Sequence, residues 1–400
     1  MKKALCAVLA LLLVFCCLPT AYATETQLSF RSDSTFRILH LTDTQDDAYP
    51  AWDMQNLLRE AIAFSDPDLI VFTGDIVEDR RIGDIGVDAF PLLEGVNVKT
   101  VKGELDLAKT RANVEKAVDA VFSVIEEFDI PYVIALGNND RKVGLSSADW
   151  LEIFSKYPHC IVFDESSDQQ DGIDYHVTVK GSDGADKFNV WLMDTGLKGI
   201  SDEQIDWYRG ASQAITQANG GEPIPAFAFQ HIQAADIGNL FEPCKITDAG
   251  ARKTGKGFVR LKSETAGGYN FYGYEPDVTT YEFEAWKACG DVIGAFFGHQ
   301  HVEGFSGVWD GIELGFTYGC EMAKTGPYGF RVFTLHEDDI YNYDNTLYRY
   351  LGKVKLGNVR IASEETFTGP EAREKPLSAM LLRLQDLMLT IVSMATSLFR

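Results

Sequence analysis

The sequence predicts a layered α/β fold, and three observations carry this prediction. Short apolar segments typical of buried strands alternate along the chain with longer segments of helical period. Polar side chains follow these apolar segments at the points where strands are expected to end. Hydrophobic residues make up 46% of the chain, so a sizeable packed core is expected and disorder is not.

The first half of the chain predicts three strands and two helices. Residues 36–41 (FRILHL), 69–72 and 131–136 are apolar segments of strand length. Residues 52–64 (WDMQNLLREAIAF) have the pattern of an amphipathic helix. Residues 111–128 repeat apolar positions at helical spacing, which predicts a second helix.

The second half continues the alternation. A helix is expected after Ser201, because Gln204 completes a capping box. Two long segments, residues 79–110 and 237–279, are interpreted as insertions that either line a substrate site or form solvated loops. Strands are expected over residues 188–193, 226–230, 292–297, 304–309, 312–317 and 330–335.

The amino-terminal residues predict export. Residues 1–23 combine Lys2 and Lys3, an apolar run and a small-residue site ending at Ala23, which is the pattern of a signal peptide rather than a membrane anchor. Residues 24–35 are then a short extension before a domain over residues 36–362. The mature protein is expected to be secreted or held in the cell envelope or periplasm.

The carboxyl-terminal residues differ in composition from the domain. Residues 363–376 are polar and predict a linker, whereas residues 377–400 predict an apolar helix. Its uninterrupted apolar part is short for a bilayer span. Three roles stay open for this helix: packing on its own domain, contact with a membrane surface, or contact with a partner.

The acidic charge of the chain limits its partners. The formal net charge is −23, and removal of Lys2 and Lys3 with the signal peptide would make it −25. Such a surface repels nucleic acid and anionic lipid, so no nucleic-acid partner is expected. The four cysteines beyond residue 23 have no zinc-binding spacing and are expected to be thiols or structural bridges: Cys160, Cys244, Cys289 and Cys320.

Polar residues at the ends of successive predicted strands form the constellation that carries chemistry. Each alone is a weak signal, but their common position at strand ends predicts that they converge at one sheet edge. Carboxylates, amides and imidazoles there supply oxygen and nitrogen ligands for divalent cations. The residues are Asp43, Gln45, Asp75, Asn138, His231, His299 and His301.

The order of these motifs resembles that of the calcineurin-like metallophosphoesterases, in particular the secreted phosphatases related to purple acid phosphatases. The pattern of that family is Asp-x-His, Gly-Asp, Gly-Asn-His-Asp/Glu, a separate His and Gly-His-x-His, and the likeness spans about residues 36–335. The resemblance implies a four-layer α/β/β/α sandwich built on two mixed β-sheets. It also implies two divalent metal ions (Mn, Fe or Zn), with the carboxylate of Asp75 between them.

The resemblance assigns a ligand set to each metal ion. The first ion would be held by Asp43, Asp75 and His301, with Gln45 at the family's histidine position. The second would be held by Asp75, Asn138, His231 and His299. In the family, two such cations hold the phosphoryl oxygens of a small phosphorylated substrate and activate the attacking water.

Two residues depart from the family pattern. Gln45 is a poorer ligand for a transition metal than the histidine it replaces. Asn139 stands where the family has a histidine that protonates the leaving group, and Asp140, which would orient that histidine, loses this role. Asn138, Asn139 and Asp140 are the expected catalytic residues. The prediction is a secreted metal-dependent phosphoester hydrolase, a phosphatase or phosphodiesterase, and the alternative is a degenerate member that only binds metal or phosphate.

Overall fold

The computed structural model describes most of the expected domain. The described residues are 27–79, 82, 106–166, 172–254, 257–268, 280–321 and 327–350, together with the backbone of 361–363. The predicted signal peptide, the predicted tail helix, nearly all of the linker and most of the 79–110 insertion lie outside these residues. None of the helices in the described ranges has both the length and the apolar character needed to cross a bilayer.

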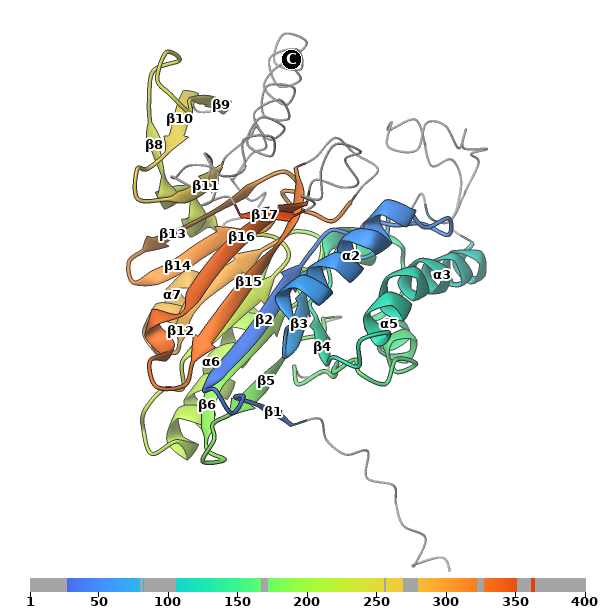
Figure 1. The fold of residues 1–400 in the computed structure, drawn as a ribbon, viewed down its shortest axis with the longest axis horizontal. Helices are drawn as coiled ribbons and strands as arrows, with labels where there is room; N and C mark the ends of the chain where they lie inside the picture. The colour runs from blue at the N-terminus through green and yellow to red at the C-terminus, as the bar shows by residue number, and fades with distance from the viewer. Residues whose placement is uncertain are drawn as a thin grey trace, which may run out of the picture.

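Two mixed sheets form the centre of the fold (Figure 1). The six-stranded sheet has the order β17 (Ile361–Ser363), β16 (Asp344–Tyr350), β15 (Tyr328–His336), β2 (Thr35–Leu41), β3 (Leu69–Phe72) and β4 (Tyr132–Ile134). The eight-stranded sheet has the order β1 (Leu28–Ser29), β5 (Tyr175–Lys180), β6 (Asp186–Met193), β7 (Ala226–Gln230), β12 (Val292–Phe297), β14 (Ile312–Phe316), β13 (Gly304–Trp309) and β11 (Ala266–Gly268). In both sheets the strands that precede the predicted ligands pair in parallel, so their carboxyl ends share one edge.

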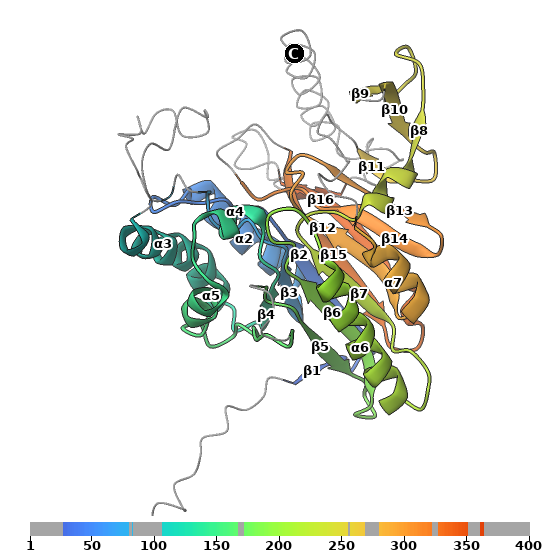
Figure 2. The same cartoon turned by 180° about the vertical axis from the view of Figure 1, so that it is seen from behind.

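Helices cover the outer faces of both sheets. The helices α2 (Trp52–Ser65), α3 (Leu107–Glu126) and α5 (Ser147–Phe154) lie beside the six-stranded sheet. On the outer side of the eight-stranded sheet lie α6 (Asp202–Ala218) and α7 (Glu282–Cys289) (Figure 2). The expected α/β/β/α sandwich of two mixed β-sheets is therefore confirmed.

Alternation along single strands separates the layers of the core. On β7, Phe227 and Phe229 pack between the two sheets, whereas Ala226 and Ala228 belong to the cluster beneath α6 and α7. The Phe229 ring lies 6.0 Å, centroid to centroid, from Phe333 of the opposite sheet. The side-chain period of two thus places large rings between the sheets and small residues under the helices.

The described part of the predicted insertion at 237–279 contains regular secondary structure, which corrects its interpretation as a loop. It begins with the 3₁₀ helix η3 (Ala235–Leu240) and continues into a separate antiparallel sheet of β8 (Phe241–Pro243), β10 (Gly257–Leu261) and β9 (Arg252–Thr254). This small sheet stands apart from the main sheets in both ribbon views. Its strands are too short, and their burial too partial, for apolar periodicity to predict them.

Helix α3 also differs from its predicted limits of 111–128. It begins at Leu107 because the Asp106 side chain caps it, accepting a hydrogen bond from the Lys109 backbone N–H (3.1 Å). It ends at Glu126, shortly before Asp129 takes a left-handed backbone conformation (φ 54°). Periodicity located the helix but not its cap. The elements β5, β16, α5, α7 and the short helix α4 (Asn138–Lys142) were not predicted.

The four cysteines within the described residues are free thiols. Of the two interpretations offered by the sequence, the structure therefore supports thiols rather than bridges. Cys320 is buried, which raises the pKa of its thiol to about 12. A buried thiol of this kind acts as a small apolar side chain rather than as a nucleophile.

A buried cluster of charged residues joins α4 to the eight-stranded sheet. Arg141 of α4 pairs with Asp194, which follows β6, and both side chains are almost fully excluded from solvent. Asp174 accepts hydrogen bonds from the Asp194 backbone N–H (2.8 Å) and from the Gln204 side chain (2.9 Å). Burial, with the charge of Asp194 second, raises the pKa of Asp174 to about 7. Below pH 7 the Asp174 carboxyl of this cluster is therefore mostly neutral.

We expect Asp174 to make stability depend on pH. Its pKa rises from an ordinary 3.8 to about 7, so the neutral form is favoured by folding. The contribution is full below pH 3.8 and is lost as the pH rises toward 7, by about 1 kcal/mol per pH unit. In the Asp174→Asn variant the amide stays neutral at every pH. The free energy of unfolding of the wild type should therefore fall relative to that of the variant as the pH rises. Urea denaturation at several pH values from 5 to 8 measures this, and a constant difference between the two proteins would contradict it.

Candidate metal centre

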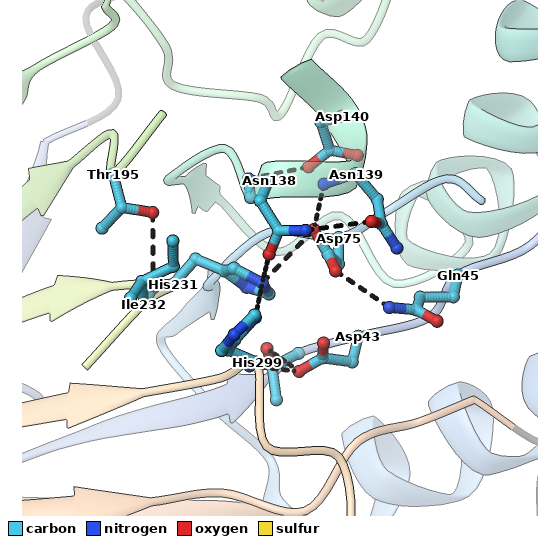
Figure 3. A network of polar contacts seen from close by, with 12 residues as sticks. Asp43, Gln45, Asp75, Asn138, Asn139, Asp140, Thr195, His231, Ile232 and His299 are labelled. Atoms are coloured by element: carbon cyan, nitrogen blue, oxygen red, sulfur yellow. Dashed lines mark hydrogen bonds and ion pairs between the residues drawn. The ribbon is translucent and has the colours of Figure 1, made fainter. Parts of the chain in front are cut away.

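The predicted ligands lie together at one edge of the two sheets. Asp43 and Gln45 follow β2, Asp75 follows β3 and Asn138 opens α4 directly after β4. His231 follows β7, and His299 and His301 follow β12. All except His299 and His301 are buried, and these two are partly buried. The sequence-predicted site residues are therefore brought to one place from both sheets (Figure 3).

The backbone of this edge is held in an uncommon conformation. Among the described residues, eight that are not glycine have positive φ, and four of these are predicted ligands: Asp43, Gln45, Asp75 and His299. Left-handed backbone costs free energy for such residues and concentrates at functional sites. The strand-end turns therefore turn the ligand side chains toward one another at a cost that packing elsewhere must offset.

Two glycines allow the β3 and β4 turns to approach closely. A Cβ on Gly74, whose φ is +79°, would lie 2.2 Å from the Gly137 backbone nitrogen. A Cβ on Gly137 would lie 2.3 Å from an Asp75 carboxylate oxygen. The glycines of the Gly-Asp and Gly-Asn motifs are thus required by the contact between the turns that carry Asp75 and Asn138.

Asp140 fastens the same two turns together. Its carboxylate accepts hydrogen bonds from the backbone N–H groups of Ile76 (2.9 Å), Val77 (3.1 Å) and Gly137 (2.9 Å). Burial, with the nearby charge of Asp75 second, raises the pKa of Asp140 to about 7. Of the three predicted catalytic residues, Asp140 therefore holds the backbone, and its side chain is not directed at the ligands.

The ligand atoms form two groups that share one residue. Asp75, His231 and His299 offer atoms within 4.8 Å of one another, and so do Asp43, Asp75 and His301. The shared carboxylate of Asp75 has one oxygen 3.3 Å from His231 Nε2 and the other 2.9 Å from Gln45 Nε2. This is the arrangement of two cation sites with a carboxylate between them.

The group around His231 is complete and oriented. His231 Nδ1 donates to the Thr73 carbonyl oxygen (2.6 Å), which leaves Nε2 directed at the other ligands. His299 Nδ1 lies 3.2 Å from His231 Nε2. The side-chain oxygen of Asn138 lies 3.1 Å from His231 Nε2 and completes the group (Figure 3).

The amide of Asn138 tests whether a cation suits this group. In the orientation drawn, its oxygen faces only the two imidazole nitrogens, and hydrogen bonding alone would favour the reversed amide, with the nitrogen donating to His231 Nε2 (3.1 Å) and His299 Nδ1 (2.8 Å). Acceptor atoms that converge in this way require a positive charge among them, which a metal ion or a proton on His231 can supply. The residues present therefore fit a divalent metal ion.

The second group is less complete. Asp43 Oδ1 is buried without a hydrogen-bond partner and lies 3.3 Å from His301 Nε2, which also suits a cation. Gln45, however, presents its amide nitrogen, 2.9 Å from Asp75 and 3.0 Å from His301 Nε2. The nitrogen is a donor, so Gln45 becomes a ligand only if its amide rotates to present the oxygen. This group is the weaker of the two sites.

The close contact of Asp75, His231 and His299 also shifts the pKa values of these three residues. Burial disfavours the charged form of His231, but the charges of Asp75 and Asp43 and the hydrogen bonds to Asp75 and Thr73 together outweigh it and raise the pKa of His231 to about 9. Burial, with the charge of His231 second, lowers the pKa of His299 to about 3. The pKa of Asp75 stays below its ordinary value despite burial, because His231 is beside it. Without a metal ion, a proton on His231 provides the positive charge that this group requires.

The remaining predicted residue, Asn139, lies next to the shared carboxylate. Its backbone N–H donates to Asp75 Oδ1 (2.7 Å), and its side-chain oxygen accepts from Lys142 Nζ (3.0 Å). Asn139 thus contributes an uncharged amide where the resembled motif has an imidazole. An amide can donate a hydrogen bond to a phosphoryl oxygen but has no proton to transfer.

Two residues of the site were not predicted from the sequence. Glu321 is buried, and one of its carboxylate oxygens lies 2.8 Å from His301 Nδ1, on the side of the ring away from the ligand atom. Lys142 places its ammonium beside Asn139. Only the spacing of three between Asn139 and Lys142 is visible in the sequence, because both residues then share a helix face. Glu321 follows a strand in a segment with no motif.

Comparison with known proteins agrees with this arrangement. Residues 36–303 match the sequence profile described as calcineurin-like phosphoesterase, which covers more than half of the chain. The chain belongs to this family. The family is one of hydrolytic phosphoesterases with a dinuclear metal centre, and this chain offers two candidate ligand groups that share Asp75.

Individual relatives differ in what their names say about activity. The chain is 25% identical over 365 residues to a protein of Arabidopsis thaliana named probable inactive purple acid phosphatase 14, covering 81% of each chain. It is 24% identical over 351 residues to probable inactive purple acid phosphatase 29 of the same plant, covering 78% of each. Among solved structures, a dimetal phosphatase from Danio rerio matches with a TM-score of 0.46 and 13% identity, covering 82% of this chain and 98% of that one.

We expect the Glu321→Gln variant to bind metal more weakly at the group that contains His301. A carboxylate oxygen of Glu321 lies 2.8 Å from the outer nitrogen of the His301 ring, and loss of a partner at that position typically costs about 10–100-fold in metal affinity. Calorimetric titration of the metal-free protein with Mn²⁺ measures the two sites. The matched control is Glu313→Gln. Glu313 lies on β14 and accepts hydrogen bonds from Tyr343 and Asn345, neither of which is a candidate metal ligand. Equal affinities in wild type and Glu321→Gln would contradict a role in holding His301.

Proposed function

We propose that this protein is a metal-dependent phosphoester hydrolase, a phosphatase or phosphodiesterase acting on a small phosphorylated substrate. The observation that carries the proposal is the position of the Asp75 carboxylate between two groups of ligand atoms. When bound there, two divalent cations supply Lewis acidity toward the phosphoryl oxygens and an activated water. Family membership supports the proposal, since the profile is one of phosphoesterases.

The residues of this chain prepare the site in two ways. Asp140 and the two glycines fix the turns of β3 and β4, so Asp75 and Asn138 keep their relative positions. The Thr73 carbonyl holds the ring of His231 by Nδ1, which keeps Nε2 available as a ligand atom. Ligands that are already in place need not reorganise when charge develops in the reaction.

Asn139 limits the substrates that the site can hydrolyse. No proton comes from its amide, so the leaving oxygen departs as an anion unless another group protonates it. We therefore propose that esters with stable leaving anions are hydrolysed and that simple alkyl phosphates are poor substrates. The identity of the natural substrate then depends on the leaving group as much as on the phosphate.

The decisive test pairs metal content with turnover. The purified protein is assayed for bound metal and for hydrolysis of p-nitrophenyl phosphate and bis(p-nitrophenyl) phosphate, with and without added Mn²⁺. We expect close to two metal ions per chain and turnover that is lost with a chelator and restored by metal. An Asp75→Asn variant, which removes the shared charge, should lose both metal and turnover. Wild-type protein that holds metal but hydrolyses neither ester would contradict the proposal.

We expect the Asn139→His substitution to increase hydrolysis of esters with poor leaving groups. A positioned general acid is typically worth about 10²–10⁴-fold, and the gain should appear with an alkyl phosphate. The gain with p-nitrophenyl phosphate should be much smaller, because its leaving group is a stable anion. The comparison of kcat/KM for the two substrates measures this. An equal change with both esters would show that residue 139 does not act on the leaving group.

A second candidate function is a binding protein derived from such an enzyme. Gln45, which presents an amide nitrogen to one ligand group, favours it, and so does Asn139. The two relatives named above also carry the word inactive in their names. In this case the site holds metal or phosphate without hydrolysing an ester, and the turnover of the metal-loaded protein separates it from the first candidate.

The location and partners of the protein form a separate part of the proposal. We propose that residues 1–23 direct export, so that the protein acts outside the cytoplasm, in the envelope or medium. Residues 377–400 would then contact the domain, a membrane surface or a partner. Sizing of the exported protein and its distribution between soluble and membrane fractions, with and without residues 363–400, tests both statements.

A further inference from the structure

The charge of the site sets a problem for an anionic substrate. The chain carries a net charge of −23, and the carboxylates of Asp43, Asp75 and Asp140 all lie at the ligand edge. Arg141 does not face the ligands, because it is paired with the buried Asp194. Cationic side chains around the candidate ligands therefore have a strong effect on whether an anion binds there.

Lys142 is such a cation. It is exposed and lies on the last turn of α4, and its Nζ is 3.0 Å from the Asn139 side-chain oxygen. Asn139 in turn contacts Asp75, the carboxylate shared by both ligand groups, through its backbone N–H. The Lys142 ammonium is thus one residue removed from the shared carboxylate, although Lys142 as a whole is exposed.

The amide of Asn138 connects Lys142 to the state of the ligands. With the amide reversed, its oxygen faces away from the imidazoles and accepts from Lys142 Nζ at 2.6 Å. When the Asn138 oxygen is directed at a cation, the Asn138 side-chain nitrogen lies next to Lys142 Nζ instead. Both of these groups are hydrogen-bond donors, so neither can accept from the other. When a cation binds at the His231 group, the Asn138 oxygen therefore no longer accepts a hydrogen bond from Lys142. The Lys142 ammonium is then able to bind an anion.

We propose that Lys142 is a substrate-binding residue, whose ammonium donates a hydrogen bond to a phosphoryl oxygen once the metal ions are in place. This inference rests on the proposed function, because it concerns the anion that the metal-loaded site receives. It also assigns a substrate class. The attraction between one fixed cation and a dianion is about twice that for a monoanion at the same distance, so Lys142 favours phosphomonoesters over phosphodiesters.

The test measures binding of inorganic phosphate as well as turnover. Metal-loaded wild type, Lys142→Gln and Lys142→Arg are titrated with phosphate at pH 8, where phosphate is a dianion. Lys116→Gln, with an equal change of charge at an exposed position of α3, is the matched control. Metal content and melting temperature of each variant confirm that the site is loaded and the protein folded.

We expect the Lys142→Gln variant to bind phosphate about tenfold more weakly, with Lys142→Arg and Lys116→Gln close to wild type, as for a charge-assisted hydrogen bond. The ratio of kcat/KM for p-nitrophenyl phosphate to that for bis(p-nitrophenyl) phosphate should fall in the same variant. A phosphate dissociation constant within twofold of wild type in Lys142→Gln would overturn the inference.

The two readouts separate this inference from the proposed function. If neither ester is hydrolysed but Lys142→Gln still weakens phosphate binding, hydrolysis fails and the role of Lys142 stands. If both esters are hydrolysed and phosphate binding is indifferent to residue 142, the hydrolase stands and Lys142 has no part in binding. Loss of affinity in Lys116→Gln to the same extent would show a general effect of charge and would also overturn the role of Lys142.

Discussion

The shared carboxylate of Asp75 is the interaction on which the rest of the structure depends. It is buried between two groups of ligand atoms, one from each side, and needs positive charge from both. The glycines at 74 and 137 bring its turn against the next one, and Asp140 ties both turns through three backbone N–H groups. Much of the polar network at this edge therefore holds the Asp75 carboxylate in a position where cations can bind it.

The two ligand groups are unequal for a physical reason. At His231, an outer hydrogen bond fixes the ring, and the Asn138 oxygen completes a set of acceptors. At His301, the corresponding outer partner is Glu321, but Gln45 places a donor among the acceptors. A cation at the first group thus replaces a proton, whereas a cation at the second must also rotate an amide. This asymmetry connects metal binding to catalysis, because a site with one cation polarises phosphate less than a site with two.

The parallel strands of both sheets explain why residues so far apart in sequence act together. The carboxyl ends of five strands lie at the same edge: β2, β3 and β4 in one sheet and β7 and β12 in the other. Ring contacts of Phe229 and Phe296 with Phe333 of the opposite sheet hold the two sheets against each other. Helix α4 then adds Asn138 and Lys142 from above that edge, anchored by the buried pair of Arg141 and Asp194. The site is therefore made by the sandwich as a whole.

The sequence by itself predicted the layered α/β class, the strands that lead to the site and the seven candidate ligand residues that the structure brings together, because these depend on local apolar periodicity and on short motifs. It did not determine the small sheet of β8, β9 and β10, whose strands are short and partly exposed, or the capped start of α3. Only the tertiary structure decided the orientation of the Gln45 amide, the role of Asp140 as a tie between turns and the approach of Glu321 and Lys142 to the ligands. These depend on which groups meet across the two sheets and α4, and such long-range contacts leave no periodic signal in the chain.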